Sequence, residues 1–283
     1  MIRTILSTGS LWLLDTAYVF ELAAEAGFDG IEVMCDQRFT TRSLAYLQRL
    51  SEEYGLPIPV LHTPFSADAL GWGNSDTELG RVRHTLKLAE ELQAETIVVH
   101  LPLRYGWASL RLGDWQARLP WFGGFEDIRS WIEKGELAEL QAKTDIHIAI
   151  ENMPTKQFWG RAVNPAYWNT MEAWSVVHDH LTLDTTHWGT FGLDPTAALQ
   201  MAAERVRHVH LSNYAGGREH RLPQTGELDL EKFLQTLART DFEGAVSVEV
   251  HPDALAFDTP KATRRKLGET LAFCRLHLQQ PTA

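Results

Sequence analysis

The 283-residue sequence has only two cysteines, Cys35 and Cys274, and few basic residues for its acidic content. Two cysteines are too few for a disulfide framework in a chain of this length, so we expect a reducing, cytoplasmic location. Lysine and arginine number 26 against 37 aspartates and glutamates, a formal net charge of −11. Because affinity for nucleic acid comes mainly from cationic contacts to phosphates, this charge disfavours nucleic acid as a partner.

Long apolar runs and flexible linkers are also missing. No stretch approaches the ~18 apolar residues of a membrane-spanning helix, and the opening MIRTILSTGS lacks the layout of a signal peptide. No segment rich in proline, glycine or serine divides the chain. We therefore expect one domain over residues 1–283, with no membrane association.

Short β-branched or aliphatic runs alternate with longer segments of helical periodicity. The expected strands are TILS (4–7), GIEVM (30–34), IPVLH (58–62), TIVVH (96–100), IHIAIE (146–151), LTLD (181–184), VRHVHL (206–211) and AVSVEV (245–250). The first intervening helix has Asp15 as its expected N-cap and Gly27 as its stop. Strand-then-helix units in this number predict a parallel sheet closed into a (β/α)₈ TIM barrel.

The segment 101–124 after the fourth strand is too long for an ordinary loop and is rich in tryptophan and arginine. Its members of these types are Trp107, Trp115, Trp121, Arg104, Arg111 and Arg118. Tryptophan faces stack on sugars and arginine binds oxygens or anions, so a lid over the substrate, with Trp107 in contact, is one interpretation. The other is a subunit interface in a homo-oligomer, because such interfaces favour the same residues.

Alternation along the strands predicts which side chains point into the barrel. Outward aliphatic rows, such as Ile146, Ile148 and Ile150, leave the residues between them pointing inward. Applied to strands three to eight, the rule places a histidine or carboxylate inward at each C-terminal end. These residues are His62, His100, Glu151, Asp184, His210 and Glu249. His208 and His147 lie deeper and are assigned a structural role.

The carboxyl ends of the strands are where barrel enzymes build their sites. A lone inward histidine or aspartate is more often a hydrogen-bonded core residue, but three carboxylates in one mouth would repel each other without a cation. A divalent metal held by Glu151, Asp184, His210 and Glu249 removes that repulsion. The mixed oxygen and imidazole donors suit Mn²⁺, Co²⁺, Mg²⁺ or Zn²⁺.

The motifs together resemble the xylose-isomerase-like TIM barrel superfamily of sugar isomerases and epimerases, which includes the endonuclease IV family. The resemblance lies in HTPF (62–65), VVHLP (98–102), IENMP (150–154), LDTTH (183–187), VHLSN (209–213), QTGELD (224–229) and VSVEV (246–250). In the epimerase branch, the resemblance implies one divalent metal bound by Glu151, Asp184, His210 and Glu249, here called the quartet. It also implies Glu151 and Glu249 as acid and base and His187 in contact with substrate.

The endonuclease branch uses more ligands, and the resemblance implies a trinuclear zinc site there. The matching positions are His62, His100, Glu151, Asp184, His187, His210, His220 and Glu249. Where that branch has a further metal-binding aspartate, this chain has Arg218, a cation that would repel the third metal. This departure and the acidic charge rank the multi-zinc phosphodiesterase second. A barrel that binds a ligand without turnover ranks third, because the quartet is intact.

The leading hypothesis is therefore a metal-dependent sugar isomerase or epimerase that transfers protons through a metal-stabilised enediolate. Glu151 and Glu249 would exchange the proton, although a pure ligand role is the alternative for either. His62, His100, His187 and His220 are expected to surround a carbohydrate-like substrate, with Arg218 binding a hydroxyl, carboxylate or phosphate. Further tryptophans expected near the mouth, Trp188 among them, favour a substrate such as a glycoside or an inositol-like ring.

Overall fold

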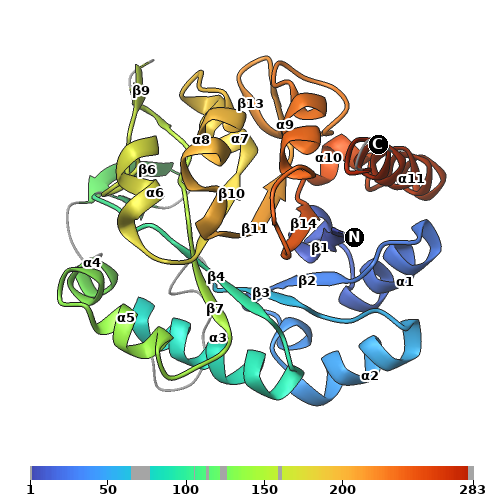
Figure 1. Ribbon diagram of the computed structural model, residues 1–283, viewed down its shortest axis with the longest axis horizontal. Coiled ribbons are helices and arrows are strands. Elements are labelled where there is room, and N and C mark those ends of the chain that lie inside the picture. The colour runs from blue at the N-terminus through green and yellow to red at the C-terminus, as the bar shows by residue number, and fades with distance from the viewer. Residues whose placement is uncertain are drawn as a thin grey trace.

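The computed structural model describes residues 2–64, 77–104, 106–112, 115–121, 126–158 and 161–279, and only the backbone of 106–112, 115–121, 126 and 158. Its central feature is a closed parallel barrel of eight strands in the order β1-β14-β11-β10-β7-β4-β3-β2 (Figure 1). These strands are β1 (Arg3–Ser7), β2 (Ile31–Met34), β3 (Val60–His62), β4 (Thr96–His100), β7 (His147–Glu151), β10 (Leu181–Asp184), β11 (Val206–Leu211) and β14 (Ala245–Val248). The predicted (β/α)₈ barrel is confirmed.

Helices surround the barrel and connect its strands (Figure 1). They are α1 (Thr16–Ala26), α2 (Leu44–Tyr54), α3 (Glu78–Leu92), α4 (Glu126–Glu133), α5 (Glu136–Gln141), α6 (Met171–Val177), α7 (Thr185–Thr190), α8 (Pro195–Ala202), α9 (Leu230–Leu237), α10 (Pro252–Leu255) and α11 (Pro260–His277), with short 3₁₀ turns at Thr8–Leu11, Phe39–Thr41 and Ala203–Arg205. The expected caps of α1 are confirmed: Asp15 accepts a hydrogen bond from Ala17 N–H, and Gly27 has φ 88°. No helix in the described part of the chain is long and apolar enough to cross a membrane.

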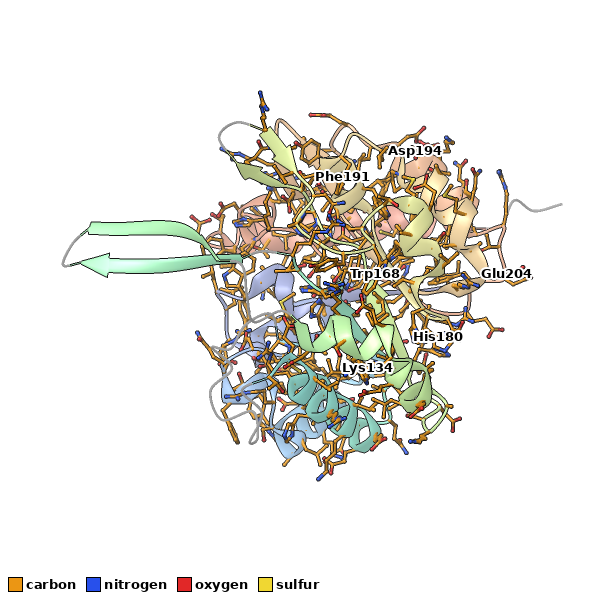
Figure 2. The ribbon with its side chains drawn as sticks, turned by 90° about the vertical axis from the view of Figure 1, so that its left-hand side faces the viewer. Lys134, Trp168, His180, Phe191, Asp194 and Glu204 are labelled. Carbon is orange, nitrogen blue, oxygen red and sulfur yellow. The ribbon has the colours of Figure 1, made fainter. Side chains whose placement is uncertain are left out.

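Three antiparallel hairpins extend the loops. They are β5 (Gly106–Leu112) with β6 (Trp115–Trp121), β8 (Lys156–Phe158) with β9 (Arg161–Val163), and β12 (Asn213–Ala215) with β13 (Arg218–Arg221). The segment expected as a long loop after the fourth strand thus contains a two-stranded hairpin, β5 and β6, and Figure 2 shows it extending away from the barrel. The side chain of Trp107 lies outside the described residues.

The predicted alternation of side chains is confirmed. The outward rows, including Ile148, Ile150 and Val209, join the main apolar core between strands and helices. Inside the barrel, Ile5, Val60, Val98 and Ala245 form a separate apolar cluster. The inward polar residues lie nearer the carboxyl end of the barrel, because they come at or near the ends of their strands. Several strand boundaries differ from the expected ones by one or two residues, and one of them concerns the site. β14 ends at Val248, so Glu249 lies one residue beyond the strand, where its N–H still donates to Leu211 O at 3.2 Å.

Three histidines gather at the opposite end of the barrel, where β7 and β10 begin. The His180 ring centroid lies 4.5 Å from that of His147 and 5.9 Å from that of His178. His180 Nδ1 and His178 Nε2 are buried and form no hydrogen bond with the described residues. Burial, together with the neighbouring His147 and Arg207, lowers the pKa of His180 to about 4.

This cluster predicts a loss of stability in mild acid. Because the folded-state pKa of His180 lies below its ordinary value, its contribution is fully present above about pH 6.5 and is lost as the pH falls toward about 4. We expect the urea midpoint to fall between pH 7.5 and pH 5, and to fall less in His180→Asn. The exposed His84 supplies the control, since His84→Asn should retain the full wild-type decrease. Equal decreases in all three proteins would contradict the assignment.

Candidate metal centre

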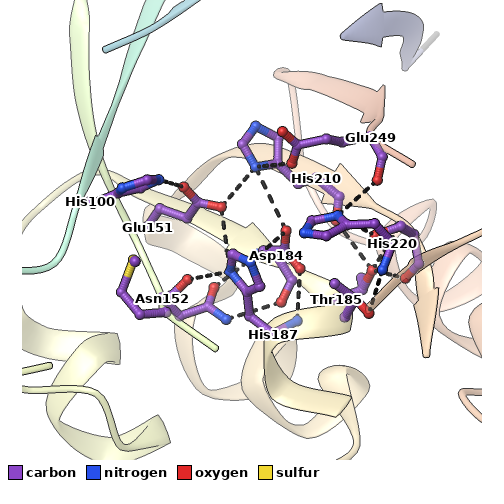
Figure 3. A network of polar contacts seen from close by, with 12 residues as sticks. His100, Glu151, Asn152, Asp184, Thr185, His187, His210, His220 and Glu249 are labelled. Carbon is purple, nitrogen blue, oxygen red and sulfur yellow. Dashed lines mark hydrogen bonds and ion pairs between the residues drawn. The ribbon is translucent and has the colours of Figure 1, made fainter. Parts of the chain in front are cut away.

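Three carboxylates, from the ends of β7 and β10 and from the residue after β14, converge on one imidazole nitrogen, Nδ1 of His210 on β11 (Figure 3). This atom lies 2.8 Å from Glu151 Oε1, 3.1 Å from Glu249 Oε2 and 3.9 Å from Asp184 Oδ2. All four residues are buried, and one ligand atom from each lies within 4.8 Å of the others. The structure therefore brings together the quartet expected from the sequence.

The junction of β10 and α7 fixes the orientation of Asp184. Its Oδ1 accepts a hydrogen bond from His187 N–H at 2.8 Å and so caps α7. Its backbone is held by Asn152, whose side chain accepts from Asp184 N–H at 2.8 Å and donates to Asp184 O at 3.0 Å. The other oxygen, Oδ2, is buried without a hydrogen-bond partner among the described residues. One oxygen thus positions the side chain while the second remains available to a ligand.

Burial and like charge oppose the ionisation of carboxylates in the cluster. Burial and the nearby carboxylates of Glu151 and Glu249 raise the pKa of Asp184 to about 8, against the opposing effect of His220. Burial opposes ionisation of Glu151 too, but His210 and other histidines hold its pKa well below the ordinary value. A divalent cation among these groups would offset the repulsion. The unpartnered Asp184 oxygen and the oxygen and nitrogen donors fit such an ion.

The four further histidines expected at the site also lie beside the carboxylates. His62 Nε2 and His100 Nε2 lie 3.3 and 3.0 Å from Glu151 Oε2, and His187 Nε2 lies 3.6 Å from Asp184 Oδ2. One ligand atom of His220 lies within 4.8 Å of ligand atoms of Asp184 and His187. The predicted proximity of these histidines to the quartet is therefore found.

Three of these histidines are held through Nδ1 by backbone carbonyl groups. The contacts join His62 to Thr63 O (2.7 Å), His187 to Asn152 O (2.7 Å) and His220 to Glu249 O (3.1 Å). Because a carbonyl oxygen only accepts, Nδ1 carries the proton and Nε2 faces the cluster. Ligating histidines in metalloproteins are commonly held in this way. His220 also has φ 53°, a left-handed conformation that is uncommon outside glycine.

A pocket of about 310 Å³ opens over the cluster, and this volume is near the lower end of the ~300–1,000 Å³ range of small-molecule sites. Six members of the cluster line it together with an aliphatic wall and a few further charged residues, and these six are His62, His100, Glu151, His187, His220 and Glu249. The wall comprises Val82, Val99, Leu101, Leu103, Ile128 and Met153, and the charged residues are Glu78, Arg81, Lys156 and Glu219. The arrangement suits a small polar molecule with one less polar face.

Other residues singled out from the sequence lie elsewhere. Arg218 is exposed on β13 and is not among the residues that line the pocket, so the structure does not bring its charge to the cluster. Trp188, expected near the mouth, is fully buried in the core, with its ring centroid 5.6 Å from that of Trp174. That expectation was wrong because Trp188 lies on the face of α7 that packs into the core.

Sequence reasoning missed two residues, Asn152 and Glu32. Glu32 is fully buried on β2, and its carboxylate contacts His208 and His210. The sequence did contain a pattern that marks Glu32, because this glutamate interrupts the apolar run GIEVM at an inward position. Asn152 follows Glu151 directly, and nothing in its spacing distinguishes an asparagine that holds a neighbouring strand from one that binds a ligand.

Comparison with known proteins places this geometry in context. The family model described as xylose isomerase-like TIM barrel matches residues 20–275. An uncharacterized protein of Mycobacterium leprae is 29% identical over 98% of both chains. A D-psicose 3-epimerase from Clostridium cellulolyticum H10, solved with D-tagatose, has a TM-score of 0.69 at 17% identity, covering 98% of this chain and all of that one. An AP endonuclease of family 2 from Brucella melitensis has a TM-score of 0.63 at 17% identity, covering 92% and 99%.

The site geometry predicts that Asp184→Asn and His210→Ala each weaken the binding of Mn²⁺. We expect a loss larger than the ~10–100-fold typical when an outer hydrogen-bond partner of a metal ligand is removed. The asparagine can still cap α7, so the fold should persist in circular dichroism. Asp194→Asn is the matched control, because Asp194 caps α8 through the same kind of contact to Thr196 N–H at 2.8 Å. Wild-type Mn²⁺ affinity in both site variants, measured by calorimetry, would contradict the assignment.

Proposed function

The chain belongs to the xylose isomerase-like TIM barrel family, and on this premise we propose that it is a divalent-metal-dependent isomerase or epimerase of a sugar, a sugar-like polyol or a glycoside. One observation carries the proposal: Glu151 and Glu249 approach the same nitrogen of His210 from different strands, beside the unpartnered oxygen of Asp184. The similar fold of an enzyme described as a D-psicose 3-epimerase supports the substrate class.

The four residues of the quartet would hold the cation, whose chemistry when bound is that of a Lewis acid that stabilises negative charge developing on substrate oxygens. Glu151 and Glu249 would then act on the carbon next to the substrate carbonyl. One carboxylate removes the proton from this carbon, and the other returns a proton to the opposite face in an epimerisation. In an aldose–ketose isomerisation, one carboxylate moves the proton between adjacent carbons.

The protonation state of Glu151 suits the role of a base. Without a bound cation, the protonated His210 and hydrogen bonds from His100, His210 and His62 outweigh the effect of burial and hold the pKa of Glu151 well below the ordinary range. A cation in the quartet would supply this positive charge in place of the proton on His210 Nδ1. Glu151 is therefore ionised at neutral pH and can accept a proton without first losing one. Asp184 has Oδ1 engaged in the helix cap and Oδ2 beside His210, so it would serve as a metal ligand.

The histidines around the quartet would orient the substrate. Their side chains reach the pocket from β3, β4, α7 and β13, on several sides of the carboxylates. The residues are His62, His100, His187 and His220. Their Nε2 atoms can exchange hydrogen bonds with hydroxyl groups, while the aliphatic wall covers the less polar face of a ring. The side chains of the β5–β6 hairpin lie outside the described residues, so the substrate contact expected from Trp107 stays a prediction.

The proton-transfer proposal predicts that Glu151→Gln and Glu249→Gln slow exchange of the substrate's α-proton by at least ~10²-fold, the usual effect of losing a general acid or base. A panel of ketoses, inososes and glycosides incubated in heavy water with Mn²⁺ would report exchange by proton NMR. Glu219→Gln is the control, because Glu219 lines the same pocket but is absent from the quartet. Exchange at the wild-type rate in both site variants would leave the reaction without its bases.

A second candidate is a multi-metal phosphodiesterase, and the carbonyl-held histidines favour it. His62, His100 and Glu151 form one group with metal-ligand spacing, and Asp184, His187 and His220 form another. Arg218, expected to oppose a third metal, is exposed outside the pocket. The number of cations per chain separates the candidates, because one suffices for the quartet while two or three would also engage these groups.

We expect one tightly bound cation per chain and no cleavage of abasic DNA at a rate suited to repair. The net charge of −11 leaves the chain poorly matched to a polyanion. The assay uses an abasic-site oligonucleotide at low salt with added Zn²⁺, and elemental analysis of the dialysed protein gives the stoichiometry. Efficient cleavage by the wild type that disappears in Glu249→Gln, with two or three zinc ions bound, would establish the second candidate instead.

A further inference from the structure

Glu32 joins two histidines inside the barrel. Its Oε1 lies 2.9 Å from His210 Nε2, and its Oε2 lies 3.1 Å from His208 Nε2. All three side chains are fully buried. Glu32 belongs to β2 and both histidines belong to β11, and β1 and β14 separate these two strands in the sheet. The carboxylate therefore reaches across the interior of the barrel to the imidazoles.

The contact determines which nitrogen of His210 can bind a cation. An ionised carboxylate only accepts hydrogen bonds, so His210 Nε2 carries a proton and donates a hydrogen bond to Glu32. The lone pair available to a metal is then on Nδ1, the atom that faces Glu151, Glu249 and Asp184 (Figure 3). Without a cation, Nδ1 lies within hydrogen-bond distance of Glu151 and Glu249 and is protonated as well. A cation would replace that proton, whereas the proton on Nε2 stays against Glu32. The opposite tautomer would place a lone pair against the Glu32 oxygen.

His208 fixes the carboxylate in turn. Its Nε2 donates to the second oxygen of Glu32, and its ring lies nearly perpendicular to that of His210, with 4.9 Å between the centroids and 89° between the planes. His208 Nδ1 is buried without a hydrogen-bond partner in the described part of the chain. His208 therefore directs its proton to Glu32, so both oxygens of the carboxylate are held.

We propose that Glu32 is a positioning residue for the metal centre: it fixes the tautomer and ring plane of His210 and thereby strengthens cation binding, and His208 holds Glu32 in place. A partner carboxylate also makes the ligating imidazole a better donor. The inference rests on the proposed metal centre, and it does not depend on which sugar reacts. Glu32 itself is not expected to ligate, because each of its oxygens lies at hydrogen-bond distance from a histidine Nε2.

Glu32→Gln tests this role, because the amide keeps the size of the side chain but offers one acceptor in place of two. Its NH₂ group must face one of the two histidines and so compete with the N–H donors of the wild type. We expect Mn²⁺ affinity to fall 10–100-fold with the stoichiometry unchanged. Ser247→Ala is the matched control, since Ser247 is buried inside the barrel and pairs with His210 in the sheet register without contacting its ring nitrogens. It should retain wild-type affinity.

The tautomer gives a readout that a purely structural role would not change. In histidine-selective ¹⁵N spectra of the Zn²⁺-loaded wild type, we expect His210 to carry its proton on Nε2, and in Glu32→Gln we expect this signal to shift or to divide between two forms. A proton on Nδ1 of His210 in the loaded wild type would overturn the proposal, even if Glu32→Gln did not fold.

The outcomes separate this inference from the proposed function. Wild-type Mn²⁺ affinity in folded Glu32→Gln refutes the positioning role and leaves the metal centre intact. Loss of one cation per chain in that variant, with unchanged affinity for any that remain, refutes it too, since Glu32 would then be a ligand. A wild-type protein that binds no divalent cation refutes the metal centre and the role of Glu32 together.

Discussion

Mutual repulsion among buried carboxylates governs the carboxyl end of this barrel. Glu151, Asp184 and Glu249 lie around one imidazole nitrogen, and burial opposes the ionisation of Glu151 and Asp184. The histidines supply part of the compensating charge. Burial and the neighbouring carboxylates nevertheless raise the pKa of Asp184 to about 8. A divalent cation is the simplest group that would supply further positive charge beside these carboxylates.

The rest of the local structure holds these groups in place. Asp184 uses one oxygen to cap α7, and Asn152 binds the Asp184 backbone in both directions. His62 and His187 donate hydrogen bonds from Nδ1 to carbonyl groups, and His210 donates one from Nε2 to Glu32. Few of these side chains can rotate without breaking a buried hydrogen bond. Such preorganisation lets a site bind a cation or stabilise developing charge without first rearranging.

Most of the fold and the quartet could be predicted from the sequence because alternation in a strand is a strict geometric rule. The same rule would have found Glu32, had it been applied to β2. Other features depend on tertiary packing that no local pattern encodes. Trp188 enters the core although it follows the strand end closely, and Arg218 is exposed although its neighbour His220 reaches the cluster. The hairpin of β5 and β6 needed a pairing register that the irregular spacing of its tryptophans and arginines did not suggest.

The two oxygens of Glu151 connect metal content to chemistry. Oε1 faces His210 in the quartet, whereas Oε2 faces His62 and His100. With one cation in the quartet, the second oxygen stays beside groups that can donate hydrogen bonds, and the carboxylate can still take a proton from a substrate carbon. A cation between His62 and His100 would engage Oε2 too, and a carboxylate with both oxygens ligated is a poor base. Proton transfer by Glu151 therefore requires that His62 and His100 bind substrate rather than a second cation. Hydrolysis by several metals requires that they bind a cation.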